Sequence, residues 1–272
     1  MPELTHFSLF SGVGGIDLAA EWAGFHTVGQ CEFADYPTKV LEKHWPDVPR
    51  WRDVRDVTVE SVRKRGIGEI TLLSGGFPCQ PFSSNGKQRG KLDERYLWPE
   101  MLRVITELRP AWVLGENVAG FIHLALDECL AGLESQGYAC QSFSIPACGI
   151  NAPHRRDRIF IVARDSYCSI GRKIAEIPQG ENSEPAGICG YDVCRIPTWA
   201  GGRSGKPTSF IPPSEVEPGI YRMADGIPKR LDRLKCLGNA VVPQQVFPIL
   251  KAIKDLHDCN IRDASQLINL AI

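Results

Sequence analysis

The sequence predicts an α/β fold in which helices cover a doubly wound, mostly parallel sheet. Short apolar segments of strand length alternate with segments of helical spacing from residue 6 to residue 163. The first apolar segment runs directly into a Ser11-Gly12-Val13-Gly14-Gly15 turn, and a helical segment follows at once. Strands that alternate with helices in this way are typical of α/β sheets with crossover connections.

The predicted elements follow one another in order along the chain. Strands are expected at residues 6–10, 26–31, 70–73, 111–114 and 158–163. Helices are expected at residues 16–22, 36–45, 99–108, 121–133 and 241–256. Pro99 supports the start of its helix, because proline is well tolerated in the first helical turn. This order places several loops after strand ends, where α/β sheets bind their ligands.

The regular alternation does not continue through the middle of the chain. Residues 165–220 contain 7 Pro and 8 Gly among 56 residues, a density that disfavours long regular elements. We therefore expect a main domain at residues 1–164 and a small loop-rich region at residues 165–225. Residues 226–272 are expected to complete the main domain.

Composition indicates a cytoplasmic protein with one sizeable core. The chain has 272 residues, of which 43% are hydrophobic. It contains no apolar stretch of membrane-spanning length and begins without a secretory signal, so its ten cysteines are interpreted as reduced thiols. The formal net charge of −1 argues against a nucleic-acid-binding protein, but residues 151–272 carry a net +4. A locally basic surface of this kind can bind phosphates.

The glycine-rich turn favours a nucleotide-like ligand. Gly12, Gly14 and Gly15 permit a tight turn and close approach of the backbone to a ligand at a helix N-terminus. Glu32 ends the next strand about 20 residues later, where Rossmann-like folds bind a ribose diol. The turn lacks both the third glycine of the dinucleotide fingerprint and the Lys-Ser/Thr of a phosphate loop. A nucleoside without a pyrophosphate, such as S-adenosylmethionine, fits best; a turn without any cofactor is the alternative.

Cys79 is the candidate nucleophile. It follows a predicted strand within the sequence Gly75-Gly76-Phe77-Pro78-Cys79-Gln80-Pro81. The two prolines restrict the backbone on either side and hold the thiol in one direction. A cysteine is reactive when its thiolate is accessible and its pKa is lowered. A buried structural cysteine is the alternative interpretation.

Three further motifs carry candidate functional groups. Glu116, after the strand at residues 111–114, can serve as a positioned acid, or as an N-cap or surface side chain. Arg156 and Arg158 lead into the last predicted strand, where they could also form a solvated basic face. Gly238-Asn239-Ala240 precedes the final helix and could simply be a cap.

The order of these motifs resembles the DNA (cytosine-5)-methyltransferase family. The resembling segments are Phe7-Ser8-Leu9-Phe10-Ser11-Gly12-Val13-Gly14-Gly15, Glu32-Phe33, Asp53, Pro78-Cys79-Gln80, Glu116-Asn117-Val118, Arg156-Asp157-Arg158 and Gly238-Asn239-Ala240. The resemblance spans residues 7–163 and roughly 226–250. It implies a Rossmann-like, S-adenosylmethionine-dependent methyltransferase sheet with a small target-recognition insertion at residues 165–225.

The resemblance also implies a role for each catalytic candidate. Cys79 is expected to add to C6 of a cytosine that is flipped out of duplex DNA, which activates C5 toward methylation. Glu116 is expected to act at N3 and Arg158 at O2, with Arg156 in the same catalytic motif. The loop at residues 83–90 is expected to close over the site and contact phosphates.

The same resemblance implies the cofactor-binding residues. They are Phe10, Gly12, Gly14, Gly15, Glu32, Phe33, Asp53, Leu97, Asn239 and Ala240. No metal is expected, because Cys168, Cys189 and Cys194 lie near no histidine and lack zinc-finger spacing.

The sequence departs from the family pattern at two places. His154 stands where the family usually has glutamine, and no clear copy of the arginine-bearing motif follows the recognition region, where Arg222, or Arg230 and Arg233, could substitute. The expected partner is double-stranded DNA, the expected state is a monomer that binds no membrane, and a cognate restriction endonuclease is left open. A tRNA-directed cytosine-5 methyltransferase and a catalytically silent DNA-binding relative are the alternatives.

Overall fold

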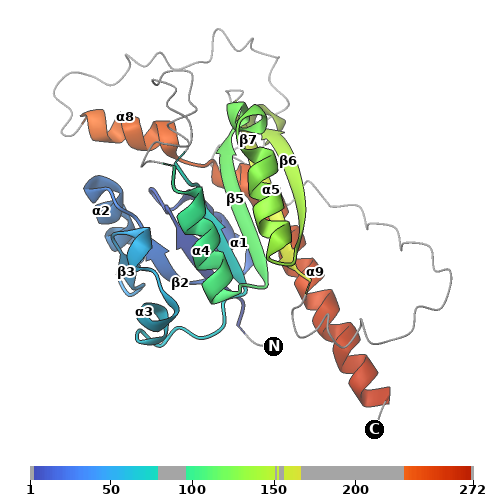
Figure 1. Cartoon of the computed structure of the whole chain (residues 1–272). Coiled ribbons are helices and arrows are strands. Elements are labelled where there is room, and N and C mark those ends of the chain that lie inside the picture. The colour runs from blue at the N-terminus through green and yellow to red at the C-terminus, as the bar shows by residue number, and fades with distance from the viewer. Residues whose placement is uncertain (1–2, 79–95, 151, 153–155, 167–229, 271–272) are drawn as a thin grey trace, which may run out of the picture.

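The structure describes much of the N-terminal part of the chain and nearly all of its last 43 residues. The computed structural model describes residues 3–78, 96–150, 152, 156–166 and 230–270 (Figure 1). Cys79, the loop at residues 83–90, His154 and nearly all of the expected region at residues 165–225 lie outside these residues.

A seven-stranded sheet organises the described residues. Its strands are β1 (Thr5–Leu9), β2 (His26–Cys31), β3 (Arg50–Trp51), β4 (Leu72–Gly75), β5 (Trp112–Val118), β6 (Tyr138–Pro146) and β7 (Asp157–Asp165). Their order across the sheet is β3-β2-β1-β4-β5-β7-β6. The strands from β3 to β5 pair in parallel, whereas β7 runs antiparallel to both β5 and β6. The predicted α/β class is confirmed, and the sheet is mixed because of β7.

Helices cover both faces of this sheet. They are α1 (Gly15–Ala23), α2 (Asp35–His44), α3 (Val59–Arg63), α4 (Trp98–Leu108), α5 (Leu126–Ser135), α8 (Arg230–Asn239) and α9 (Pro243–Leu270). Short 3₁₀ turns are η1 (Val54–Asp56), η4 (Ala119–His123) and η5 (Ala147–Ile150). No helix in the described part of the chain combines the length and apolar character needed to cross a bilayer.

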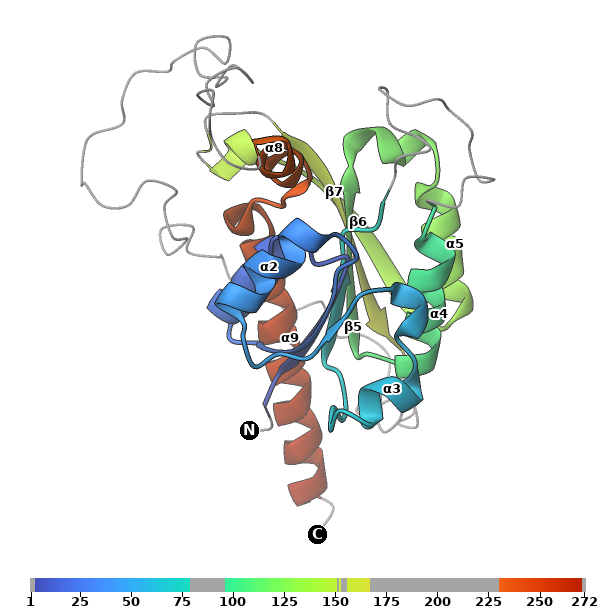
Figure 2. The same ribbon diagram turned by 90° about the vertical axis from the view of Figure 1, so that its left-hand side faces the viewer.

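Each face of the sheet has its own hydrophobic core. On one face, Ala19 and Ala20 of α1 are fully buried in one cluster with Ile249 and Leu250 of α9. On the other face, α3, α4 and α5 supply the buried side chains, and Figure 2 shows α9 on the opposite side of the sheet from α4 and α5. Because both faces are covered, β4 is buried along its whole length, as is typical of central parallel strands.

The strands differ from the sequence-based prediction at several places, and the short β3 was not predicted. The strand expected at residues 111–114 continues to Val118, so Glu116 and Asn117 are strand residues rather than loop residues. The reason is that β7 pairs with every residue of β5. β6 was not predicted, because it lies at the sheet edge with largely exposed side chains and carries no continuous apolar signal.

The helices also differ in their boundaries. The helix expected at residues 121–133 is instead η4 followed by α5, because Phe121 is fully buried against Phe77 and Ala125 leaves the helical conformation. α8 was not predicted, so Gly238 and Asn239 end a helix rather than form an isolated entry turn. α9 continues to Leu270, well beyond the predicted end at residue 256.

Replacing Gly29 by Ala is expected to destabilise the fold. A Cβ at Gly29 would lie 2.4 Å from a ring carbon of Phe7, which is fully buried and packs against Trp51. Such overpacking typically costs about 1–3 kcal/mol, which urea unfolding would measure. Gly68→Ala is the control, since a Cβ there meets no atom within 4 Å and should change stability by less than about 0.5 kcal/mol. Equal effects of the two substitutions would contradict the packing argument.

Candidate active site

The turn between β1 and α1 requires glycine residues, which have no Cβ atom. Gly12 and Gly14 have φ values of +55° and +84°, in the left-handed region that favours glycine. A Cβ at Gly14 would lie 2.5 Å from the Trp45 ring, and a Cβ at Gly15 would lie 2.5 Å from the carbonyl oxygen of Val241. The glycines therefore allow α2 and the segment between α8 and α9 to pack directly on the turn.

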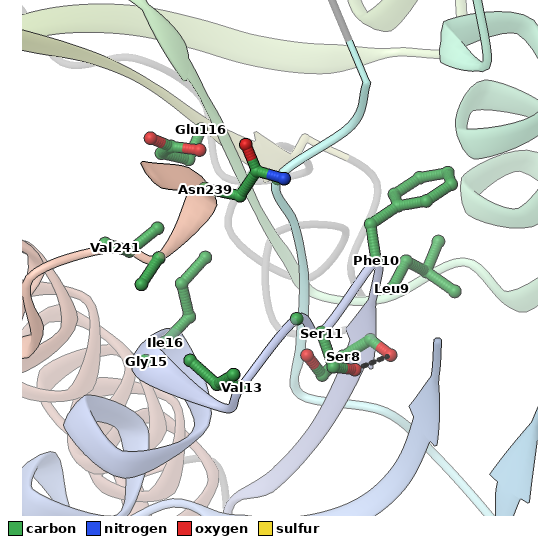
Figure 3. A pocket seen from close by; sticks show the side chains of 13 residues that line it. Ser8, Leu9, Phe10, Ser11, Val13, Gly15, Ile16, Glu116, Asn239 and Val241 are labelled. Atoms are coloured by element: carbon green, nitrogen blue, oxygen red, sulfur yellow. Dashed lines mark hydrogen bonds between the residues drawn. The ribbon is translucent and has the colours of Figure 1, made fainter. Parts of the chain in front are cut away.

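A pocket opens beside this turn at the carboxyl edge of the sheet (Figure 3). It measures about 360 Å³, counting the solvent at its mouth. The residues that line it are Ser8, Leu9, Phe10, Ser11, Gly12, Val13, Gly15, Ile16, Gly76, Glu116, Asn239, Ala240 and Val241. The pocket thus joins the glycine turn, the residue after β4, the end of β5 and the segment between α8 and α9.

Of the predicted cofactor residues, half line the pocket. These are Phe10, Gly12, Gly15, Asn239 and Ala240. Gly14 lies in the same turn, where it faces the Trp45 ring and does not line the pocket. The remaining predicted residues, Glu32, Phe33, Asp53 and Leu97, lie outside the pocket lining.

Glu32 connects the end of β2 to the glycine turn. Its carboxylate accepts hydrogen bonds from the backbone N–H groups of Gly12 and Ala34, both at 2.8 Å. Beside it, the Phe33 side chain is 76% exposed. Asp53 caps η1 by accepting from the N–H of Arg55 at 2.9 Å, and Leu97 precedes α4. Glu32 and Phe33 are therefore close to the turn in the fold, as the sequence suggested.

Glu116 and Arg158 form a buried ion pair between neighbouring strands. Glu116 pairs with Phe160 in the β5–β7 register and Val118 pairs with Arg158, so the two charged side chains are diagonal neighbours on one face. Glu116 Oε1 lies 2.8 Å from Arg158 Nε, and the two side chains are only 9% and 11% exposed. This places both predicted catalytic groups together, with Glu116 in the pocket wall.

Burial raises the pKa of Glu116 to about 7, although Arg158 and then Arg156 act in the opposite direction. A carboxyl group with this pKa carries its proton for part of the time at neutral pH. Perturbed pKa values of this kind cluster at functional sites, because acid–base chemistry needs a group that can hold and release a proton.

The segment that leads to Cys79 is anchored next to Glu116. Asn117 Nδ2 donates to the carbonyl oxygen of Phe77 at 3.2 Å, and the Phe77 ring packs against Trp98 at 5.1 Å. A Cβ at Gly76 would lie 3.1 Å from Glu116 Oε2. Cys79 itself lies outside the described residues, but the chain two residues before it is held beside the predicted acid.

The Arg156 side chain contacts the segment at the end of α8. Its guanidinium donates to the carbonyl oxygens of Gly238 and Ala240, the first at 2.8 Å. Its backbone is in the left-handed region with φ of +35°. Arg156 therefore supports the pocket wall at the end of α8, while its neighbour Arg158 pairs with Glu116.

Sequence reasoning missed the buried polar group behind the turn. Asp17 of α1 is fully buried and accepts hydrogen bonds from Gln30 Nε2 at 2.9 Å and Ser8 Oγ at 3.1 Å. Burial raises its pKa to about 6. Gln30 also accepts from Arg50 Nε at 2.9 Å, which continues the network toward α2. The sequence signal that could have revealed this group is an acidic residue, Asp17, among the apolar helix residues Ile16, Leu18 and Ala19.

Comparison with known proteins agrees with this geometry. A family model described as C-5 cytosine-specific DNA methylase matches residues 4–185, which is more than half of the chain. The chain belongs to this family. Within the described residues of the match are the glycine turn, Glu32 and the Glu116–Arg158 pair.

The chain aligns with only part of the length of individual relatives. The chain is 31% identical over 203 residues to the Type II methyltransferase M.NgoMIV of Neisseria gonorrhoeae, covering 73% of this chain and 64% of the relative. It is 37% identical over 161 residues to M.PspPI of Psychrobacter sp., covering 57% and 38%. This chain therefore spans between about a third and two thirds of the length of these relatives.

Solved structures share the fold. The described residues resemble a variant of Spodoptera frugiperda DNMT2 with a TM-score of 0.51 and 21% identity, covering 67% of this chain and 54% of the other. They also resemble the S. pombe Dnmt2 methyltransferase with a TM-score of 0.51 and 23% identity, covering 66% and 57%. At these identities the likeness establishes the Rossmann-like methyltransferase fold.

Replacing Glu116 by Gln is expected to change how stability depends on pH. Because the pKa of Glu116 is about 7 in the folded state and about 4.5 in the unfolded chain, the unfolded chain releases its proton first as pH rises. The wild-type protein should therefore lose stability relative to Glu116→Gln between about pH 4.5 and pH 7. Urea unfolding of both proteins at several pH values measures this, and a difference that is independent of pH would contradict it.

Proposed function

We propose that this protein transfers a methyl group from S-adenosylmethionine to C5 of cytosine in double-stranded DNA. The observation that carries the proposal is the buried ion pair of Arg158 with Glu116, which lines the pocket beside the glycine turn. Membership of the C-5 cytosine-specific DNA methylase family supports the same reaction. Because the chain covers only part of its relatives, the activity, the substrate and the partners are all part of this proposal.

The donor set around the turn fits S-adenosylmethionine. Each oxygen of the Glu32 carboxylate accepts one backbone hydrogen bond and keeps a lone pair free for a ribose hydroxyl. The exposed Phe33 ring stands next to it and can cover an adenine face, while Asp53 and Leu97 lie on the segments beyond. A Cβ at Gly12 would meet no protein atom within 4 Å, so its absence leaves the backbone there open to the cofactor. When bound, S-adenosylmethionine supplies an electrophilic methyl group on its sulfonium.

The chemistry proposed for Cys79 is covalent catalysis. The thiolate sulfur forms a bond to C6 of the cytosine, and the electrons of the C5–C6 double bond give C5 the character of an enamine carbon. This carbon would be the nucleophile for the methyl group that bound S-adenosylmethionine supplies, and the leaving group would be a neutral thioether. A water near the site removes the C5 proton, the C5–C6 double bond re-forms, and the sulfur leaves C6 as a thiolate.

Glu116 and Arg158 are proposed to hold the polar edge of the base. Negative charge develops toward N3 as the thiolate adds, and a protonated Glu116 can donate or share its proton there. The Arg158 guanidinium has further N–H groups besides the one on Glu116, so it can donate to O2. Because both side chains are nearly buried, the base must leave the duplex to reach them, at a cost of a few kcal/mol.

The same contacts support a proposed domain division. We propose that residues 1–164 and 226–272 form one catalytic and cofactor-binding domain, since Val241 packs on Gly15, and that residues 165–225 recognise the target. The protein is proposed to be a cytoplasmic monomer. A cognate restriction endonuclease is a further proposed partner, supported by relatives that are named Type II methyltransferases.

Labelled S-adenosylmethionine distinguishes the proposed substrate from its alternatives. The full chain, incubated with the labelled cofactor, is expected to transfer label to duplex DNA and not to tRNA. Label in tRNA alone would contradict the DNA substrate and favour the tRNA-directed branch. DNA binding without any transfer would favour a catalytically silent relative. Bisulfite sequencing of DNA from an expressing host would then locate the methylated cytosines.

Replacing Cys79 by Ser is expected to abolish methyl transfer while cofactor binding persists, because a hydroxyl is a much weaker nucleophile than a thiolate. DNA that contains 5-fluorocytosine should trap the wild-type protein covalently, because fluorine cannot leave C5 as a cation. The variant should form no such complex. Substantial activity of Cys79→Ser, or no trapping by active wild-type protein on cognate DNA, would contradict the covalent route.

A further inference from the structure

The amide of Gln245 lies at the junction of three segments that form the site. Gln245 is fully buried in the first turn of α9. Its Nε2 donates to the carbonyl oxygen of Ile145 at the end of β6 and to the carbonyl oxygen of Arg156, the latter at 3.1 Å. Ile145 pairs with Arg158 in the β6–β7 register. The amide therefore caps the end of the β6–β7 ladder beside the residue that pairs with Glu116.

Arg156 extends this connection to the pocket wall. Its guanidinium donates to the carbonyl oxygens of Gly238 and Ala240, which end α8. A cation at this position satisfies carbonyl groups that have no partner within the helix and interacts favourably with the helix dipole. Asn239 and Ala240 line the pocket. The Arg156 side chain thus holds the pocket segment Gly238–Ala240 in place. The carbonyl oxygen of Arg156 in turn accepts a hydrogen bond from Gln245.

We propose that Gln245 is a positioning residue for both halves of the site. Through Arg156 it fixes the position of the pocket segment Gly238–Ala240. Through the start of β7 it fixes the position of the Arg158 guanidinium. The proposal deepens the function proposed above and rests on it. It accounts for the left-handed backbone of Arg156, because the hydrogen bond from Gln245 holds that carbonyl oxygen in place. It also accounts for a fully buried glutamine in an otherwise apolar helix face with Val246, Ile249 and Leu250.

Two substitutions test the connection at successive points. Gln245→Leu keeps a similar volume but removes both donated hydrogen bonds. Arg156→Lys keeps the positive charge at a half-buried position but cannot bond both carbonyl oxygens with the same fork geometry. The control is Gln244→Leu, which changes the neighbouring amide on the same helix outside the pocket lining. Circular dichroism and thermal unfolding establish that each variant is folded.

Equilibrium dialysis with labelled S-adenosylmethionine and methyl-transfer kinetics on duplex DNA provide the readouts. Both test variants should bind the cofactor about tenfold more weakly, or about 1.4 kcal/mol, since they leave a buried carbonyl oxygen without its hydrogen bond. In Gln245→Leu, kcat should also fall about tenfold, because Arg158 is no longer held against Glu116. Gln244→Leu should match the wild type in both measurements.

The pH profile separates positioning from a purely structural role. If Arg158 moves away, Glu116 loses the nearest cation that lowers its pKa, and its proton is retained to higher pH. The alkaline limb of kcat in Gln245→Leu should therefore shift to higher pH. A folded Gln245→Leu with wild-type affinity, kcat and pH profile would overturn the proposal, as would lower thermal stability with unchanged kinetics. Wild-type protein that neither binds the cofactor nor methylates DNA would instead overturn the proposed function and the inference that rests on it.

Discussion

The ion pair of Glu116 with Arg158 is the interaction on which the proposed chemistry of the site depends. A buried carboxylate is costly unless it is paired, and a fully paired one would remain ionised and could not give a proton. Here burial raises the pKa of Glu116 and Arg158 lowers it, and the balance lies near neutrality. That balance requires β7 to lie antiparallel to β5, because this register makes the two side chains diagonal neighbours.

The pocket also depends on the absence of Cβ atoms in the glycine turn. Gly14 and Gly15 face the Trp45 ring and the Val241 carbonyl at distances that leave no room for a Cβ. This contact brings a segment more than 200 residues away in sequence onto the first turn of the chain. The C-terminal part therefore completes a site that the N-terminal strands begin.

Polar groups behind the pocket hold its two walls. On one side, Asp17 joins Ser8 and Gln30 beneath the glycine turn. On the other side, Gln245 and Arg156 join the ends of β6, β7 and α8. Hydrogen bonds of this kind are directional, so each network restricts the position of the segments it joins. These contacts behind the pocket support the residues that line it.

The sequence by itself determined the α/β class, the glycine turn, the acid at the end of β2 and the family to which the chain belongs. These features were predictable because they depend on short motifs and on the local spacing of apolar residues. The tertiary structure decided what is non-local: the length of β5, the edge strand β6, the contact of Arg156 with α8 and the buried position of Gln245. It also decided the pKa of Glu116, since burial and a cation from another strand have no signature in the residues next to it.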